Sequence, residues 1–125
     1  MQPSRDFWRS CDPAHVSIDA AGVATGSTAV PSDLAAILAA HPLIHAAEGV
    51  LFQEAVAGAC EARGLNVVRV RERDLWSKLG SDVRQEVDSL RSLIGPPWGA
   101  DQKTATAAAL IALADTSIRV AVRNQ

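Results

Sequence analysis

The stretch Pro42–Val70 constrains the fold most, because it reads as a strand, a helix and a strand in close succession. Leu43–Ala47 is a short apolar run that predicts a strand. Apolar residues then recur at i, i+3, i+4, i+7 and i+8 from Phe52, which predicts a helix buried along one side. Leu65–Val70 is β-branched and partly alternating, which predicts a second strand. Two strands joined by such a helix normally lie parallel, so we predict an α/β fold.

Glu48 directly follows the first of these predicted strands. In an open α/β sheet, ligands bind beyond the carboxyl ends of the strands. Glu48 is therefore the acid that we expect nearest to a functional site. Arg63-Gly64 closes the helix that follows it, with the glycine at the C′ position.

Length and composition predict one globular domain over residues 15–125, preceded by an N-terminal arm over residues 1–14. The chain has 125 residues, of which 48% are hydrophobic and 21% charged. The longest apolar run, Ala105–Ala114, is too short to span a bilayer, and the N-terminus has no apolar h-region. We therefore expect a cytoplasmic protein with no membrane partner. A net charge of −2 argues against a global positive field for nucleic acid.

The histidines and cysteines do not form a recognised ligand set. His41 and His45 are four residues apart, but Pro42 between them argues against a shared helical face, so no zinc site is expected. Cys11 and Cys60 make no paired motif and are expected to be reduced.

Before Pro42, the pattern predicts a hairpin and then a helix. Residues 15–30 read as two strands with a turn at Ala20-Ala21-Gly22, which places Asp19 at the end of the first strand. Ser32 is the expected N-cap of a helix that ends before Pro42.

Beyond Val70, the pattern becomes helical. We predict a short helix over Leu75–Leu79 and a longer one from Ser81 to Ile94. A stiff break at residues 96–99 precedes a last helix, which Asp101 opens as N-cap or first-turn acid and whose apolar stripe runs over Ala105, Ala108, Ala109, Ala112 and Leu113. Residues 116–123 fit an edge strand and a fraying helix equally well.

This order of elements resembles the RNase H-like superfamily, and within it the RuvC-type Holliday-junction resolvases. The resemblance covers roughly residues 15 to 115. It implies an α/β fold with a small mixed sheet, made of a hairpin plus two parallel strands and flanked by four or five helices. The similar stretches are Ser17–Gly22, Thr25-Gly26, Leu43–Glu48, Arg73–Leu75 and Asp101 ahead of the alanine-rich helix.

The resemblance implies that Asp19, Glu48 and Asp101 are catalytic acids that hold two divalent metals, Mg²⁺ or Mn²⁺, for phosphodiester cleavage. If the first strand of the family fold is absent, Asp19 is no ligand and the metal ligands are Glu48 and Asp101. Helix capping is the alternative explanation for Asp101, and turn chemistry is the alternative for Asp19. For Glu48, the alternative is pairing with Arg69 or Arg71. The nucleic-acid-binding candidates are Arg69, Arg71 and Arg73, with Lys103 near the scissile phosphate, although a solvated edge explains the arginines too.

The chain departs from the resemblance where the family has a second acid in the last helix, since Thr104 and Ala105 stand there. We therefore expect a degenerate, non-catalytic binding or assembly module that forms a homodimer or binds a protein partner, with Ser117–Val122 as an added strand. The alternative is a resolvase-like endonuclease acting on structured nucleic acid. A small-molecule site at the end of the sheet is a third class, which no glycine-rich phosphate loop supports.

Overall fold

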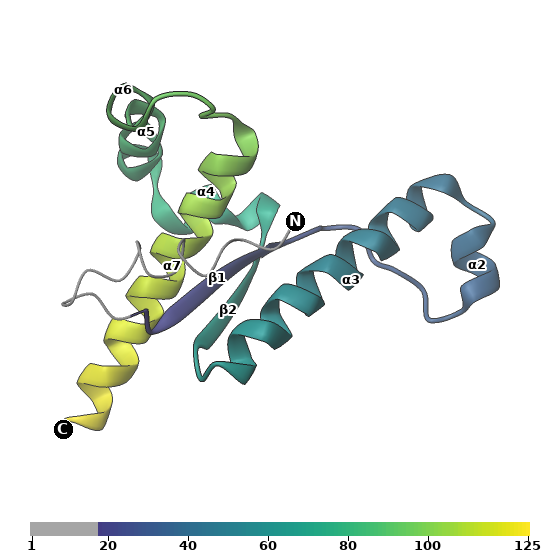
Figure 1. Ribbon diagram of the computed structural model, residues 1–125, viewed down its shortest axis with the longest axis horizontal. Helices are drawn as coiled ribbons and strands as arrows, with labels where there is room; N and C mark the ends of the chain where they lie inside the picture. Colours follow the sequence, from purple (N-terminus) through teal and green to yellow (C-terminus); the bar gives the residue numbers. More distant parts are fainter. Residues whose placement is uncertain (1–17) are drawn as a thin grey trace.

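The computed structural model describes residues 18–125 and shows a mixed α/β fold that is mostly helical (Figure 1). Strands β1 (Ala20–Thr25) and β2 (Asn66–Arg71) form a two-stranded parallel sheet, in which Ala20 lies opposite Asn66. The helices of the described residues are α2 (Leu34–Leu38), α3 (His41–Ala62), the 3₁₀ turn η1 (Glu72–Asp74), α4 (Leu75–Leu79), α5 (Ser81–Ser89), α6 (Arg91–Ile94) and α7 (Ala100–Arg123).

A parallel pair with a helical crossover is confirmed, but the first strand of the pair is not the one predicted. Leu43–Ala47 is helical, as part of the 22-residue α3, so the predicted strand is wrong. Pro42 lies in the first turn of α3, where its missing N–H has no intrahelical partner to lose. The proline therefore opens the helix, and Glu48 lies on it rather than at a strand end.

The predicted hairpin is also wrong within the described residues. Ala20-Ala21-Gly22, the expected turn, is the first half of β1, and β1 pairs with β2. The hydrogen-bonding partner of this segment is a strand distant in sequence, which a local turn pattern does not reveal. Gly22 also lies against α7, where a methyl group would overlap the backbone carbonyl of Ala108. Residues 15–17, which belong to the predicted hairpin, lie outside the described residues.

The helix ends follow the predicted glycines closely and the predicted caps less closely. Gly64 has a φ of 79° and donates to the Glu61 carbonyl, while Leu65 donates to that of Cys60, which together form a Schellman motif. The side chain of Asp33, not of Ser32, caps α2 by accepting from the Ala35 amide at 3.1 Å.

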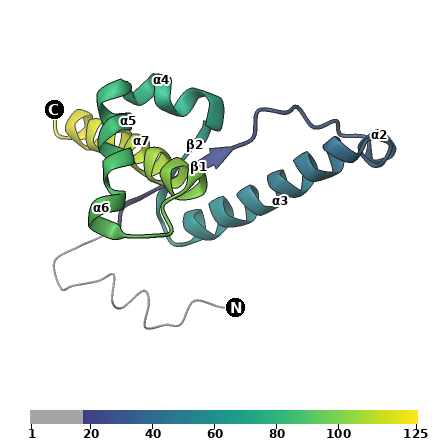
Figure 2. The ribbon, with the colours of Figure 1, turned by 90° about the horizontal axis from the view of Figure 1, so that it is seen from above.

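The sheet lies between α7 and α3, and the core forms where α7 covers the strands (Figures 1 and 2). Val70, Leu75, Ala107 and Ala108 are its buried centre, and Leu75 is the only large side chain of the described residues that is almost fully buried. The buried face of α7 runs through Ala107, Ala108 and Ala112. Of the predicted stripe, Ala108 and Ala112 are buried, whereas Ala105, Ala109 and Leu113 are exposed.

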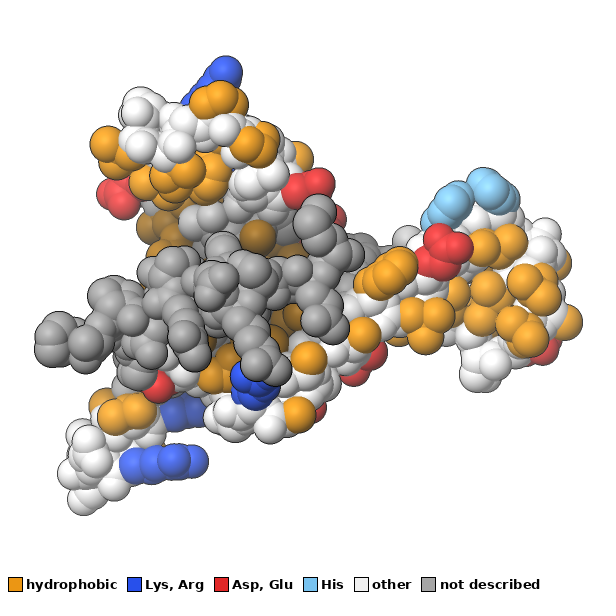
Figure 3. Space-filling view, in the orientation of Figure 1, with side chains coloured by type: hydrophobic (Ala, Val, Ile, Leu, Met, Phe, Trp, Pro, Cys, Tyr) orange, Lys and Arg blue, Asp and Glu red, His pale blue; other side chains and the backbone are white. Residues whose placement is uncertain are grey.

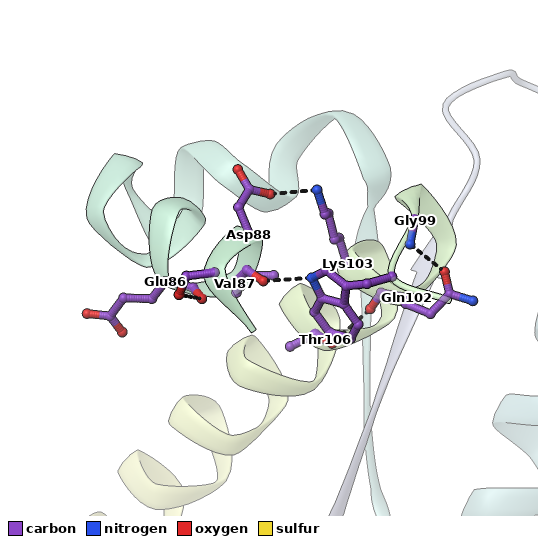
Figure 4. Close-up of polar contacts among 9 residues, drawn as sticks. Glu86, Val87, Asp88, Gly99, Gln102, Lys103 and Thr106 are labelled. Carbon is purple, nitrogen blue, oxygen red and sulfur yellow. Dashed lines mark hydrogen bonds and ion pairs between the residues drawn. The ribbon is translucent and has the colours of Figure 1, made fainter. Parts of the chain in front are cut away.

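The single helix predicted from Ser81 to Ile94 is interrupted at Leu90. The Val87 carbonyl accepts from the Leu90 amide at 3.3 Å. It also accepts from Trp98 Nε1 at 2.9 Å, a contact marked in Figure 4. Both lone pairs of this oxygen are then in use, so it cannot also accept the next α-helical hydrogen bond. Figure 4 also shows Lys103 paired with Asp88, and Gly99 donating to Gln102 ahead of α7.

Residues 116–123 are helical, so Ser117–Val122 is not a strand available for addition to another sheet. The polar pattern explains why α7 continues: Arg119 pairs with Asp115 one turn earlier at 2.9 Å. The side chain of Asn66 donates to Asp115 and to Thr116, which ties this part of α7 to the start of β2.

Candidate functional site

The three acids expected at a metal site lie on separate elements. Asp19 immediately precedes β1, and its carbonyl accepts from the Asn66 amide at 3.1 Å. Asp101 lies in the first turn of α7, as predicted, and Glu48 lies on α3. Within residues 18–125, no group of three or more His, Cys, Asp or Glu side chains is placed to hold a metal ion. The structure therefore does not assemble the set that the resemblance implies.

Asp19 and Asp101 line different recesses, at opposite ends of β1. The recess beside Asp19 includes Asn66 and Thr116, from the later turns of α7. Asp101 lines another, together with Gly22–Ala24 of β1. Because the strands are parallel, the recess beside Asp101 lies at their carboxyl ends, where open α/β sheets usually bind ligands.

We call the recess beside Asp101 the carboxyl-end crevice. Its volume is about 330 Å³, and α3 closes one side of it with Phe52, Gln53 and Val56. Glu72, the first residue after β2, brings a second carboxylate. Its lining residues are Gly22, Val23, Ala24, Phe52, Gln53, Val56, Glu72, Asp101, Thr104 and Ala105.

Glu72 was not among the predicted site residues, although its position two residues after a predicted strand was a usable signal. Mg²⁺ is often bound through one or two carboxylates together with waters. Glu72 and Asp101 are the described acids that share the carboxyl-end crevice. This pair could hold one such ion with water ligands.

Each basic residue expected to contact nucleic acid has an acidic neighbour. Arg69 contacts Glu54 at 3.1 Å and Glu61 at 3.2 Å, both on α3, and its hydrogen bond to Glu54 raises the pKa of the guanidinium further. Arg71 and Arg73 lie 2.9 and 3.9 Å from Asp74. Lys103 pairs with Asp88 at 3.0 Å. These contacts favour the interpretation of the arginines as a solvated edge, while their binding to nucleic acid stays a prediction.

The largest feature that was not predicted from the sequence is the exposed apolar surface of α2 and α3. We call these two helices the α2–α3 arm. Figure 1 shows α2 and the start of α3 extending away from the sheet, and Figure 3 shows hydrophobic side chains gathered there. Ala57 is the only fully buried residue of α3, so most of the predicted buried stripe is not covered. The large exposed side chains of the arm are Leu34, Leu38, Val50, Leu51, Phe52 and Val56.

A signal for this surface was present in the sequence. Between Leu43 and Ala62, α3 carries few polar side chains, and they do not gather on one face. A helix that is apolar all round is normally buried in a larger assembly or in a membrane. In this chain, by contrast, α3 is largely exposed.

The histidine prediction needs correction. Because Pro42 is accommodated in the first turn of α3, His41 and His45 share one face of the helix, and their Nε2 atoms are 2.9 Å apart. Figure 3 shows the histidine side chains together at the surface.

By length and composition alone, α7 could cross a membrane, although the apolar run within it was too short by sequence analysis. This is weak support for a membrane location, because a core helix meets the same criterion, and α7 packs on both strands.

Comparison of the chain with known protein families, with curated proteins and with solved structures found no match.

Proposed function

We propose that this chain is a non-catalytic assembly module that forms a homodimer through the α2–α3 arm. The observation that carries the proposal is α3, a 22-residue, largely apolar helix with only Ala57 fully buried. Monomeric proteins rarely expose large contiguous apolar patches, and such patches commonly mark protein interfaces.

The area of the arm is sufficient for a dimer. Its six large exposed side chains are between 43% and 74% exposed. At roughly 100 Å² each, they expose roughly 600 Å² per copy, so the two copies together can bury at most roughly 1,200 Å² of this surface. That total is the lower limit for specific interfaces, so a micromolar rather than a permanent dimer is expected.

A second copy fits this surface because α3 is nearly self-complementary. Its midpoint falls at Leu51 and Phe52, so two antiparallel copies related by a twofold axis there bring these two residues of each copy against the other. In this register, Glu48 lies across from Ala55, while Glu54 pairs with Arg69 of its own sheet. No acid then opposes another, and the small side chain of Ala55 permits close approach of the helices.

The test is the mass of the full chain in solution. We expect light scattering at increasing micromolar concentration to approach twice the chain mass of 13.2 kDa. Phe52→Ser should return the chain to the monomer mass, because it removes a side chain that is 74% exposed at the proposed axis. The melting temperature of the wild type should also rise with protein concentration.

Leu93→Ser is the matched control, since Leu93 is 83% exposed on α6, outside the arm. It should leave the dimer intact. A wild type that stays monomeric throughout, or a dimer that Leu93→Ser disrupts as strongly as Phe52→Ser does, would contradict the proposal.

The finer fold assignment belongs to the same proposal: a degenerate RNase H-like domain. It is supported by the parallel strands with their helical crossover and by α7, which packs on β1 with Asp101 in its first turn. The helical position of Glu48, and Thr104 and Ala105 in place of a second acid, favour a role in binding over catalysis.

A second function, a metal-dependent nuclease, draws support from Glu72 and Asp101 in the carboxyl-end crevice. If this function holds, Mg²⁺ or Mn²⁺ should support cleavage of branched or hybrid nucleic acid. Asp101→Asn and Glu72→Gln should each abolish the cleavage, while Asp82→Asn on α5 should not. Gel assays would check this, and the absence of cleavage by the wild type would exclude this function.

A further inference from the structure

The first two turns of α3 carry a pair of imidazoles that face each other. His41 Nε2 and His45 Nε2 are 2.9 Å apart, and the two rings meet edge to face with their centroids 4.5 Å apart. At this distance, one nitrogen donates its proton to the lone pair of the other. Both Nε2 lone pairs become available to a shared metal ion when the donating ring takes the other tautomer, with its proton on Nδ1.

We propose that His41 and His45 bind one divalent transition-metal ion through their Nε2 atoms. With metal–nitrogen bonds of about 2.05 Å, two ligands at a right angle lie about 2.9 Å apart, and two tetrahedral ligands lie about 3.3 Å apart. The spacing of the two Nε2 atoms therefore matches neighbouring corners of a square-planar or octahedral site. A tetrahedral site needs only a small opening of the pair.

Glu48 is a positioning residue of this site rather than a ligand. Its Oε2 lies 3.6 Å from His45 Nδ1, on the ring edge away from His41. A carboxylate there favours the tautomer with the proton on Nδ1, which leaves Nε2 free to bind metal. Metal-binding histidines commonly have such a carboxylate partner. The negative charge of Glu48 also offsets the repulsion between a cation and the positive end of the helix dipole.

The chemistry of the donors selects the metal. Imidazole nitrogens suit Cu²⁺, Ni²⁺ and Zn²⁺, whereas Mg²⁺ prefers oxygen ligands. The side chains of His45 and Glu48 are 64% and 58% exposed, so water can complete the coordination. The site is therefore expected to bind Cu²⁺ most tightly, then Ni²⁺ and Zn²⁺, and to reject Mg²⁺.

The experiment titrates the full chain with Ni²⁺, followed by calorimetry, and with diamagnetic Zn²⁺, followed by the imidazole ¹⁵N shifts. We expect one ion per chain, with shifts at the Nε2 atoms of His41 and His45. His41→Gln and His45→Gln should each weaken binding about tenfold or more. Both changes are at exposed positions, and circular dichroism checks that the helix is retained.

Two controls separate this site from general metal binding. His15→Gln removes the remaining histidine of the chain and should leave the affinity unchanged. Glu48→Gln should weaken binding about tenfold and shift the tautomer of His45 in the metal-free chain, whereas Glu86→Gln, the same change on α5, should do neither. Undiminished binding in the double variant His41→Gln/His45→Gln, or no binding at millimolar Ni²⁺, would overturn the proposal.

Discussion

Gly22 is the glycine of the described residues where an added methyl group meets the least space. Its Cα faces the backbone of α7, and an added Cβ would overlap the Ala108 carbonyl rather than a side chain that could move away. The contact between β1 and α7 depends on this glycine, because the contacting atoms belong to the backbone and no side chain can rotate to make room. A larger residue at this position therefore forces β1 and α7 apart.

Gly22→Ala should lower the free energy of unfolding by about 3 kcal/mol, the upper part of the range for overpacking. Urea denaturation would measure this change. Gly58→Ala is the matched control on α3, where an added methyl group meets nothing within 4 Å. Alanine is favoured over glycine inside a helix, so the control should gain about 0.5–1 kcal/mol. Equal stability of Gly22→Ala and the wild type would show that β1 and α7 pack less closely than described.

At the scale of elements, the sequence predicted best where a local signal suffices. Gly64, Gly80 and Gly95 each have a positive φ and lie just after the end of a helix. The bounds of β2 differ from the predicted strand by one residue at each end. α4 was predicted over the same residues that it occupies. Each of these predictions rests on a glycine or on β-branched side chains within a few residues.

The errors arose where a residue has two meanings that only its position decides. Proline breaks a helix when it lies in the helix interior, but it is well tolerated in the first turn. Because Pro42 was interpreted as a helix breaker, Leu43–Ala47 was predicted to be a strand and Glu48 was placed at its end. The same interpretation excluded a shared helical face for His41 and His45. Ala20-Ala21-Gly22 read as a turn because its partner strand is more than forty residues away. The candidate crevice was missed for the same reason, since Glu72 gains meaning only when β1 and α7 lie beside it.

The break between α5 and α6 is also set by a distant residue, Trp98, which packs half-buried and donates to the Val87 carbonyl. Trp98→Phe should lower the free energy of unfolding by about 1 kcal/mol, because it removes this hydrogen bond from a partly buried site. Thermal denaturation would measure it. Ser89→Ala removes an exposed hydrogen bond to the Glu86 carbonyl of the same helix and should change stability by less than about 0.5 kcal/mol. A larger effect of Ser89→Ala than of Trp98→Phe would refute this account.

For the whole molecule, the main property is a small core beside a large uncovered helix. Two strands become stable only with further strands or with helices packed against them, and here α7 supplies most of that packing. The buried centre contains three residues no larger than valine besides Leu75. A chain with so little buried side-chain volume gains proportionally more from association, which agrees with the proposal that a second copy covers the α2–α3 arm.

The α2–α3 arm lies within a long connection, residues 26–65, which runs from the end of β1 to the start of β2. The six-residue parallel pairing closes this whole loop. Loop-closure entropy grows only logarithmically, so doubling the length of such a loop costs about 0.6 kcal/mol. Length can therefore be added between β1 and α3, ahead of the part of α3 that packs on the sheet, at little cost to the sheet and α7, which makes this connection a place where insertions are readily tolerated.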